Sequence, residues 1–237
     1  MKKQSLSILI VSAIILSCLI FKVSGCGKTG EPEDHNVWLP RALKDIFLVQ
    51  PGTYWIMEEV GLDRNYRDSV YVVETIHDTV VILHPGSREP FALKERFRVI
   101  CYSPFYGSEY HFVTESADFC GTINWQEPCH FIVVEKHNLN RIEGRSRIYY
   151  YPDEPDRGWD VRNSGLAEPQ VRITNIHSSF TPVDEIFSDV RRVEIELDRA
   201  LQNTRSIRYI SPEAGIVQWE LPAYGVKWVN VRRNIVR

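Results

Sequence analysis

The stretch that decides the fold is PGTYWIMEEVGLDRNYRDSVYVVETI, which spans residues 51–76. It contains two apolar runs that are rich in β-branched and aromatic residues, at 54–57 and 70–76. Between them lie four residues that favour turns: Gly61, Asp63, Asn65 and Asp68. Two such runs around a polar turn are typical of an antiparallel hairpin. The stretch therefore predicts a long hairpin with a polar tip.

The rest of the chain continues in the same β-rich pattern. About ten short apolar or alternating segments are joined by short links, without regular helices between them, which favours an antiparallel sheet over βαβ units. Residues 192–197 alternate strictly between apolar and charged side chains, as in a strand with one face in water. We expect a mostly β fold, an antiparallel twisted sheet in the form of a half-barrel or sandwich. One or two short helices are expected at 40–49 and 182–190, and a strand break at His77-Asp78.

The composition indicates a folded protein without affinity for nucleic acid. Of the 237 residues 43% are hydrophobic and 25% charged, which is ordinary for a globular chain. Residues 1–25 hold three lysines and no acidic residue. The chain after residue 25 therefore has 25 of the 28 basic residues and all 31 acidic ones, a net charge of −6. A mildly acidic chain without a basic stripe has no electrostatic reason to bind a phosphate backbone.

The N-terminus has the outline of a secretory signal. Lys2 and Lys3 precede an apolar run at 6–21, and small residues follow. A single membrane-spanning anchor is the rival interpretation, since the run is only slightly short of a span. The run ends in Val-Ser-Gly-Cys at 23–26, which resembles the bacterial lipobox. This resemblance implies a lipoprotein signal peptide at 1–25 and lipidation of Cys26 with palmitate-type acyl chains. Ordinary secretory cleavage that leaves Cys26 unmodified is the alternative.

The residues after Cys26 bear on the destination of the chain. By resemblance to Gram-negative lipoproteins, Gly27 in place of an aspartate implies the outer membrane. Lys28, followed by acidic residues, is similar to a surface-export signal, but a polar tether explains these residues equally well. We therefore expect a lipid-anchored outer-membrane protein, on the periplasmic or the surface side. We expect a flexible tether at 26–36 and a single β-rich domain at 37–237.

Two distant segments together resemble a known class of proteins. The first combines GTYW at 52–55 with RDSVYV at 67–72, and the second combines FSDV at 187–190 with YISPEAGIVQWE at 209–220. They resemble small Gram-negative, Bacteroidetes-like lipoproteins of no assigned activity. In that class an early hairpin pairs with a late strand, so the resemblance implies a β-rich, often half-barrel-like fold and transfers no catalytic residue.

The late strand at 216–221 alternates in a way that suggests which side chains are buried. Val217, Trp219 and Leu221 share one face, whereas Glu220 belongs to the other. Charged Glu220 is expected in water. Trp219 is therefore expected to point inward, against the early hairpin that begins at residue 54.

After the expected signal peptide, the chain has cysteines at 101, 120 and 129 besides Cys26. Outside the cytoplasm disulfides persist, and Cys120 and Cys129 flank a loop that contains glycine and proline. We favour a Cys120–Cys129 bridge with Cys101 buried and free, and Cys101–Cys120 is the alternative. His130 adjoins Cys129 but points to the other face of a strand, which disfavours a catalytic thiol.

Neither the acidic residues nor the histidines indicate a metal site. Four carboxylates crowd one loop, Asp153, Glu154, Asp156 and Asp160, but their spacing does not match an EF-hand, and a solvated acidic loop is the simpler interpretation. The histidines at 77, 84, 111, 130 and 137 show no ligand spacing such as H-E-x-x-H. The sequence therefore predicts no metal and no cofactor.

Aromatic residues are the remaining candidates for a binding site. One group surrounds the loop at 103–109, and another surrounds residues 149–159. Alternation buries at least half of each group, so core packing is the simpler interpretation. The candidates for facing a ligand are Tyr106, Tyr110, Tyr150 and Trp159.

No sequence pattern names an enzyme. We find no nucleophile elbow, phosphate loop, dinucleotide fingerprint or paired carboxylates. We expect a lipid-anchored cell-envelope protein without catalytic activity, a binding or envelope-assembly module for an apolar ligand or a protein partner. A structural or adhesive surface protein is the first alternative. A hydrolase outside the cytoplasm, acting through its long loops, is the second.

Overall fold

The computed structural model describes residues 36–61, 66–83, 86, 88–117, 129–139, 141–151, 158–159, 171–201 and 204–237. These residues belong to one compact unit, Asn36–Arg237. Its elements are helix α2 (Arg41–Phe47), a 3₁₀ turn at Pro222–Tyr224, and the strands β1 (Tyr54–Val60), β2 (Arg67–Leu83), β3 (Pro90–Ser103), β4 (Ser108–Ala117), β5 (Cys129–Asn138), β6 (Arg141–Tyr151), β7 (Gly158–Trp159), β8 (Val171–Phe180), β9 (Phe187–Asp198), β10 (Thr204–Ser211), β11 (Gly215–Leu221) and β12 (Val226–Asn234).

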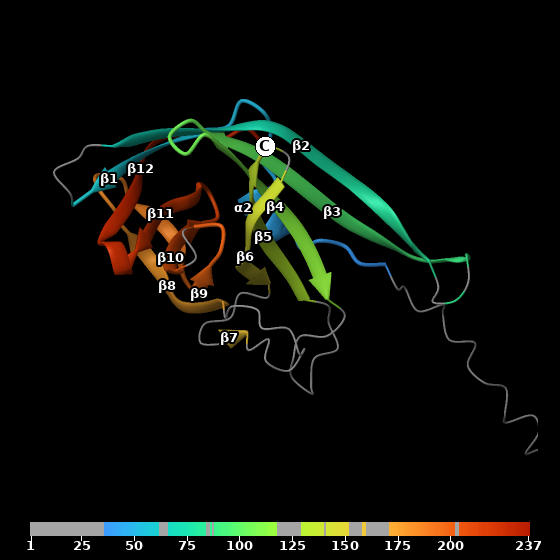
Figure 1. Cartoon of the computed structure of the whole chain (residues 1–237). Coiled ribbons are helices and arrows are strands. Elements are labelled where there is room, and N and C mark those ends of the chain that lie inside the picture. Colours follow the sequence, from blue (N-terminus) through green and yellow to red (C-terminus); the bar gives the residue numbers. More distant parts are fainter. Residues whose placement is uncertain are drawn as a thin grey trace, which may run out of the picture. The chain divides into compact units, whose positions relative to one another are not determined.

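All the described strands belong to one antiparallel sheet, which confirms the predicted fold class. Their order in the sheet is β6-β5-β4-β3-β2-β1-β12-β11-β10-β9-β8-β7. The first and last strands therefore pair with each other in the middle of the sheet, and the two edges lie at β6 and β7. In Figure 1 the sheet arches around α2, with β8–β12 on one side and β4–β6 on the other. The sheet is nearly closed into a barrel, which excludes the two-layered sandwich.

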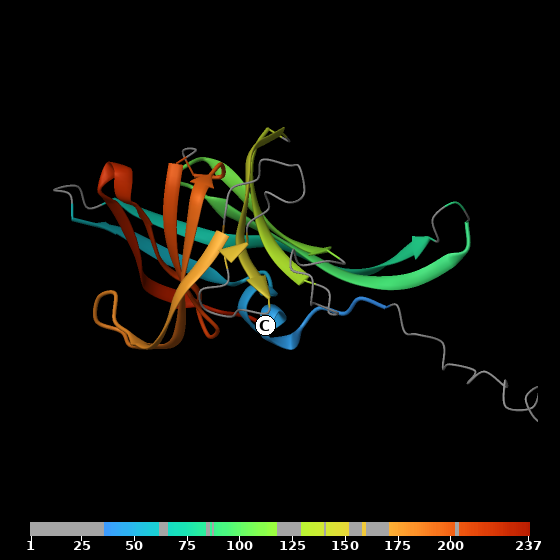
Figure 2. The ribbon, with the colours of Figure 1, turned by 90° about the horizontal axis from the view of Figure 1, so that it is seen from below.

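The predicted early hairpin is confirmed, and it is longer than the sequence indicates. Strands β1 and β2 pair from Tyr54↔Tyr71 to Glu58↔Arg67. The expected break at His77-Asp78 is wrong, because β2 continues to Leu83 in a long ladder with β3. Polar partners across that ladder stabilise it, since His77 contacts Glu95 (Nε2–Oε1 2.7 Å) and Asp78 pairs with Arg96 (2.7 Å). The far part of this β2–β3 hairpin extends beyond the rest of the sheet in Figures 1 and 2.

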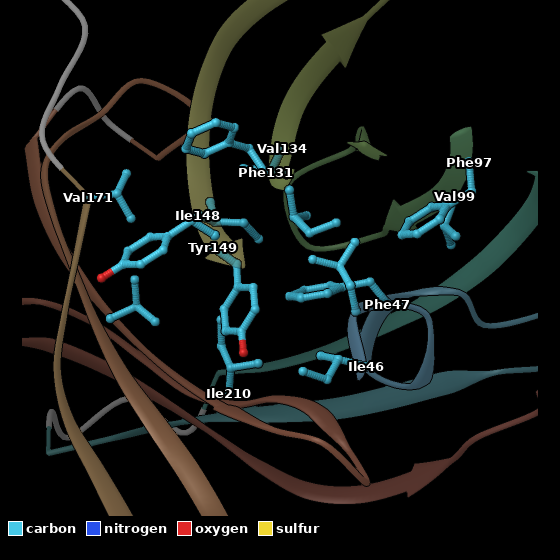
Figure 3. Packing of buried hydrophobic residues seen from close by; sticks show 14 of the residues in the cluster. Ile46, Phe47, Phe97, Val99, Phe131, Val134, Ile148, Tyr149, Val171 and Ile210 are labelled. Carbon is cyan, nitrogen blue, oxygen red and sulfur yellow. The ribbon is translucent and has the colours of Figure 1, made fainter. Parts of the chain in front are cut away.

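Of the two expected helices the first is confirmed. Helix α2 buries Leu43, Ile46 and Phe47, which follow the spacing of one helix face. The ring of Phe47 lies 6.4 Å from that of Phe112 and 5.4 Å from that of Tyr149. Figure 3 shows Ile46 and Phe47 directed into the apolar core between the strands. The helix therefore fills part of the space that the curved sheet surrounds.

The second expected helix, at 182–190, is wrong. Residues 182–184 form a bend, and β9 begins at Phe187 and pairs with β8. Phe187 and Val190 are buried in a small apolar cluster with Ala214 and Val217. This cluster is separate from the main core, and its contacts favour the extended backbone.

Among the described residues, edge strand β6 meets the strands near the opposite edge of the sheet through side chains and not through a strand ladder. Strand β6 contacts β8 and β9. The hydroxyl oxygen of Ser146 accepts a hydrogen bond from the backbone N–H of Arg199 (2.7 Å), and the Tyr150 hydroxyl accepts one from Ile173 N–H (3.3 Å). A Cβ atom added to Gly144 would lie 1.7 Å from the backbone oxygen of Arg199. Only glycine allows the two backbones to approach so closely.

The late strand does not pair with the early hairpin, contrary to what the resemblance implies. Strand β12 lies between β1 and β11. The late segment still contacts the early hairpin through the turn between β10 and β11. There the indole N–H of Trp55 donates a hydrogen bond to the Ala214 carbonyl (2.8 Å). A β-bulge in the β10–β11 ladder at Val217 separates that residue from Trp219. Val217 packs in the small cluster, while Trp219 faces the interior with Ile216.

Candidate functional site

The inner side of the curved sheet holds a cavity of about 120 Å³. Helix α2 contributes Ile46 and Phe47 to its wall, and strands from both halves of the sheet contribute the rest. Figure 3 shows the core around these two residues, with Val99 and Val134 among the neighbours that also line the cavity. This volume is somewhat smaller than that of an enclosed apolar cavity of about 150 Å³ that holds one benzene ring. The cavity is partly open, so it has room for a short branched chain or for a small ring that extends through the opening.

Three tryptophans form much of the apolar wall. Trp219 on β11 and Trp228 on β12 are cross-strand neighbours whose rings stack 5.7 Å apart at 13°. Trp55 on β1 is held by its hydrogen bond to Ala214. Flat, rigid rings give a large contact area at small entropic cost. Trp219 therefore lies on the interior side of its strand, as predicted.

A short loop between β3 and β4 lines the cavity beside these tryptophans, through Tyr106 and the adjoining Ser103. The ring of Phe105 lies 5.1 Å from that of Trp228. Buried Asp68 holds this loop, because its carboxylate accepts hydrogen bonds from the Ser103 hydroxyl (2.5 Å) and the Phe105 N–H (3.2 Å). The Ser103 oxygen in turn accepts one from the Tyr106 N–H (3.2 Å). The wall at this point is therefore fixed by a carboxylate and not by apolar packing alone.

Tyr106 and Tyr110, two of the predicted ligand-facing aromatics, meet at this polar part of the cavity. Their ring centroids are 6.4 Å apart, and both line the cavity. Burial raises the pKa of the Tyr106 phenol, and the carboxylates of Asp68 and Glu59 raise it further. Burial likewise raises the pKa of Tyr110. Both phenols therefore keep their protons and remain neutral donors at neutral pH.

A buried ion pair completes the polar part. Arg208 lines the cavity and donates to the Asp198 carboxylate (2.5 Å). Asp198 is fully buried and also accepts hydrogen bonds from the Ser206 hydroxyl (2.6 Å) and from Ala200 and Leu201 N–H (3.2 Å each). Within the described part of the chain, Arg208 Nε is buried without a hydrogen-bond partner. An unpaired donor at a cavity wall is unusual and offers a contact to a bound acceptor.

The other two aromatic candidates are not brought to this cavity. Tyr150 is buried and does not line the cavity. Its hydroxyl accepts the hydrogen bond from Ile173 that links β6 to β8. The side chain of Trp159 lies outside the described residues. The acidic loop residues Asp153, Glu154, Asp156 and Asp160 also lie outside them.

The cysteine predictions are tested only in part. Cys101 is buried beside Phe97 and Val99 and carries a free thiol, as expected. Burial raises the pKa of this thiol to about 12, so it stays protonated and is a poor nucleophile. Cys120 and the side chain of Cys129 lie outside the described residues, so their bridge stays a prediction. Cys26 lies outside them as well.

The structure also brings together a group that the sequence patterns did not indicate. His111, Glu135 and His137 place one potential ligand atom each within 4.8 Å of one another. The available signal was the repeated triplet Glu-x-His at 109–111 and 135–137. This triplet becomes meaningful only when the two strands are known to be neighbours in a given register.

One observation on the helices and the comparisons with known proteins complete the description. In the part of the chain that the structure describes, no helix has the length and apolar character needed to cross a membrane. In the comparisons with known proteins, the chain matches no protein-family model, no curated protein and no solved structure.

Proposed function

We propose that this protein is a lipid-anchored binding protein of the cell envelope, without catalytic activity, that holds a small apolar ligand inside its sheet. The single observation that carries the proposal is the apolar cavity of about 120 Å³ walled by tryptophans. Ligand sites are typically concave and apolar, with a few polar groups that fix orientation. The anchor at Cys26 and the outer-membrane location rest on the resemblance to lipoproteins.

The polar part of the cavity indicates which ligands fit. Three carboxylates, Glu59, Asp68 and Asp198, and one guanidinium, that of Arg208, lie near the phenols of Tyr106 and Tyr110. An anionic ligand would be repelled by this excess of negative charge. The free donor at Arg208 Nε and the neutral phenols of Tyr106 and Tyr110 instead suit an uncharged oxygen acceptor. The proposed ligand is therefore apolar, uncharged and equipped with one hydroxyl or carbonyl oxygen.

The proposal can be tested with the tryptophans as reporters. Benzyl alcohol combines one ring with one hydroxyl, and it should change the tryptophan emission of the mature chain in a saturable way. Benzoate should bind more weakly because it carries a negative charge. Val70 lines the cavity, so the larger side chain of Val70→Phe should occupy the cavity and abolish the signal. Val73→Phe, at an exposed position on the same strand, should leave the signal unchanged.

Two results would contradict the proposal. One is a signal that rises linearly with ligand without saturation, and the other is equal binding by the Val70 and Val73 variants. Native mass spectrometry of the membrane-extracted protein would then identify a retained natural ligand directly.

A second candidate function is contact with another envelope protein. The extended part of the β2–β3 hairpin exposes large apolar side chains, among them Val81, Leu83 and Phe91. Apolar side chains gathered on a projecting hairpin are typical of an interaction surface. Crosslinking in intact cells through a photoreactive residue at 81 would capture such a partner, and the absence of any crosslinked species would count against this candidate.

A further inference from the structure

Two triplets of the same form, Glu109-Tyr110-His111 and Glu135-Lys136-His137, lie side by side on β4 and β5. In the ladder His111 is opposite Glu135, and Glu109 is opposite His137. Side chains alternate along a strand, so these four point to the same face of the sheet and Tyr110 points to the other. Since Tyr110 lines the cavity, the His–Glu cluster (Glu109, His111, Glu135 and His137) lies on the opposite face of the sheet.

The members of the His–Glu cluster are close together, and all of them except the half-exposed Glu109 are mostly shielded from water. The rings of His111 and His137 stack 3.7 Å apart at 17°. His137 Nε2 contacts Glu135 Oε2 at 3.2 Å, and His111 Nε2 contacts Glu109 Oε2 at 3.3 Å. The side chains of His111, Glu135 and His137 keep only 10%, 12% and 15% of their exposure. Two imidazoles and a carboxylate in a solvated surface cluster would be more exposed than these three side chains are.

One nitrogen in the cluster has no partner. In the described part of the chain His111 Nδ1 is buried and makes no hydrogen bond. Glu109 accepts from Nε2 of the same ring, so Nδ1 is the nitrogen that carries the free lone pair. A histidine held by a carboxylate through one nitrogen, with the other nitrogen free, is the usual arrangement of a metal-bound histidine and its outer partner.

Neighbouring side chains fix the carboxylate of Glu135. Arg145 donates to its Oε1 (3.1 Å), which leaves Oε2 directed at the histidines. Arg98 brings positive charge near His111 and so opposes a bound cation. Arg145 adds a second positive charge beside Glu135, and the carboxylates of Glu109 and Glu135 balance the charges of these two arginines. The cluster therefore combines two imidazoles with a carboxylate that is held in place.

We propose that His111, Glu135 and His137 form a site for one divalent metal ion of the zinc class on the outer face of β4 and β5. Two imidazoles and one carboxylate are a known donor set for Zn²⁺, with water in the fourth position. Ligand atoms around one tetrahedral Zn²⁺ stand roughly 3.3 Å apart, so the side chains must rotate to shorten the observed spread of up to 4.8 Å when the ion binds. This site departs from the expectation of no metal, and it does not depend on the cavity.

Metal binding to the full mature chain, prepared without a histidine tag, tests the proposal. Calorimetric titration with Zn²⁺ should show one ion per chain. His111→Ala and His137→Ala should each weaken binding at least tenfold. His77→Ala is the matched control, because His77 lies on β2, pairs with Glu95 outside the cluster and should leave affinity unchanged. Zn²⁺ should also raise the melting temperature of the parent and of the control, but not of the two cluster variants.

Cobalt distinguishes this site from the cysteines of the chain. Co²⁺ bound to imidazole and carboxylate gives only weak visible bands, whereas a thiolate ligand adds an intense charge-transfer band. That intense band would overturn the assignment, and so would undiminished Zn²⁺ affinity in both histidine variants or no binding by the parent. Should an alanine variant fail to fold, Glu135→Gln keeps the shape of the side chain and should still weaken binding.

Discussion

At the scale of single residues, Asp198 supports the polar part of the cavity. It is fully buried and accepts hydrogen bonds from Arg208, Ser206 and the backbone of the β9–β10 turn. Asp198→Ala leaves the buried guanidinium of Arg208 without its counter-charge, a change that typically costs about 3–5 kcal/mol. Denaturant melts should show this loss. Adding Arg208→Met should recover part of it, and a double variant no more stable than Asp198→Ala would contradict the account.

A second residue-scale effect is the dependence of stability on pH at His130. This residue is buried on β5 and contacts the Ser116 hydroxyl at 3.0 Å. Burial, and then the charge of Lys94, lower the pKa of His130 to about 4, while Glu95 opposes the shift. The unfolded chain binds the proton near its ordinary pKa of about 6.5.

Because the unfolded state binds more protons between these values, stability rises with pH from about 4 to about 6.5 and is level above. The contribution amounts to at most about 3 kcal/mol. His130→Gln should therefore lose less stability than the parent when denaturant melts are repeated at about pH 5 and about pH 7. Equal losses in the two proteins would show that other groups cause the acid sensitivity.

At the scale of elements, β11 shows how a bulge redistributes side chains. Trp219 lines the cavity and stacks on Trp228, and it is only partly buried. Trp219→Ala should cost about 2–3 kcal/mol, less than a fully buried tryptophan, because one side of the ring already faces a cavity. Glu220 is not simply in water, since it accepts a hydrogen bond from buried Gln218 at 2.5 Å. Glu220→Ala should therefore cost about 1 kcal/mol. If denaturant melts show a larger loss of stability for Glu220→Ala than for Trp219→Ala, the two faces of the strand are assigned the wrong way round.

The elements also show where sequence reasoning succeeds and where it fails. The early hairpin and α2 were predictable, because local periodicity and turn residues determine them. The continuity of β2 through His77 depends on partners on β3. The bulge at Val217 and the pairing of β1 with β12 likewise depend on distant residues. The cavity and the His–Glu cluster both depend on how the strands are aligned with one another. The sequence could therefore supply candidate residues such as Tyr106, but not show which of them lie together in the fold.

At the scale of the whole molecule, the lipid anchor is a prediction of the lipobox alone. Cys26→Ala should abolish labelling by a fatty-acid analogue and move the protein out of the detergent phase, because the acyl chains supply the affinity for the membrane. Cys101→Ala is the control, since that thiol is buried in the fold and should not affect labelling. Labelling that persists in the Cys26 variant would disprove the assignment.

The closure of the sheet is the feature that unites the two halves of the molecule. In the described residues, the halves are joined by the β1–β12 ladder on one side and by side chains and close backbone contact at the β6 seam. At this seam a Cβ on Gly144 would meet the Arg199 oxygen at 1.7 Å, a distance that neither backbone can keep. Gly144→Ala must therefore separate β6 from the β9–β10 turn and weaken the hydrogen bonds of Ser146.

We expect Gly144→Ala to lower the free energy of unfolding by about 1–3 kcal/mol, the usual cost of overpacking. Ile142→Ala, on the same strand at an exposed position, should be nearly neutral and serves as the control. Hydrogen exchange should report faster opening at Arg199 and Ala200, whose N–H groups donate to Ser146. Opening of the seam would also admit water to the core between the halves, so the Gly144 variant should bind benzyl alcohol more weakly. Parent-like stability and exchange in that variant would mean that the halves are held by the β1–β12 ladder alone.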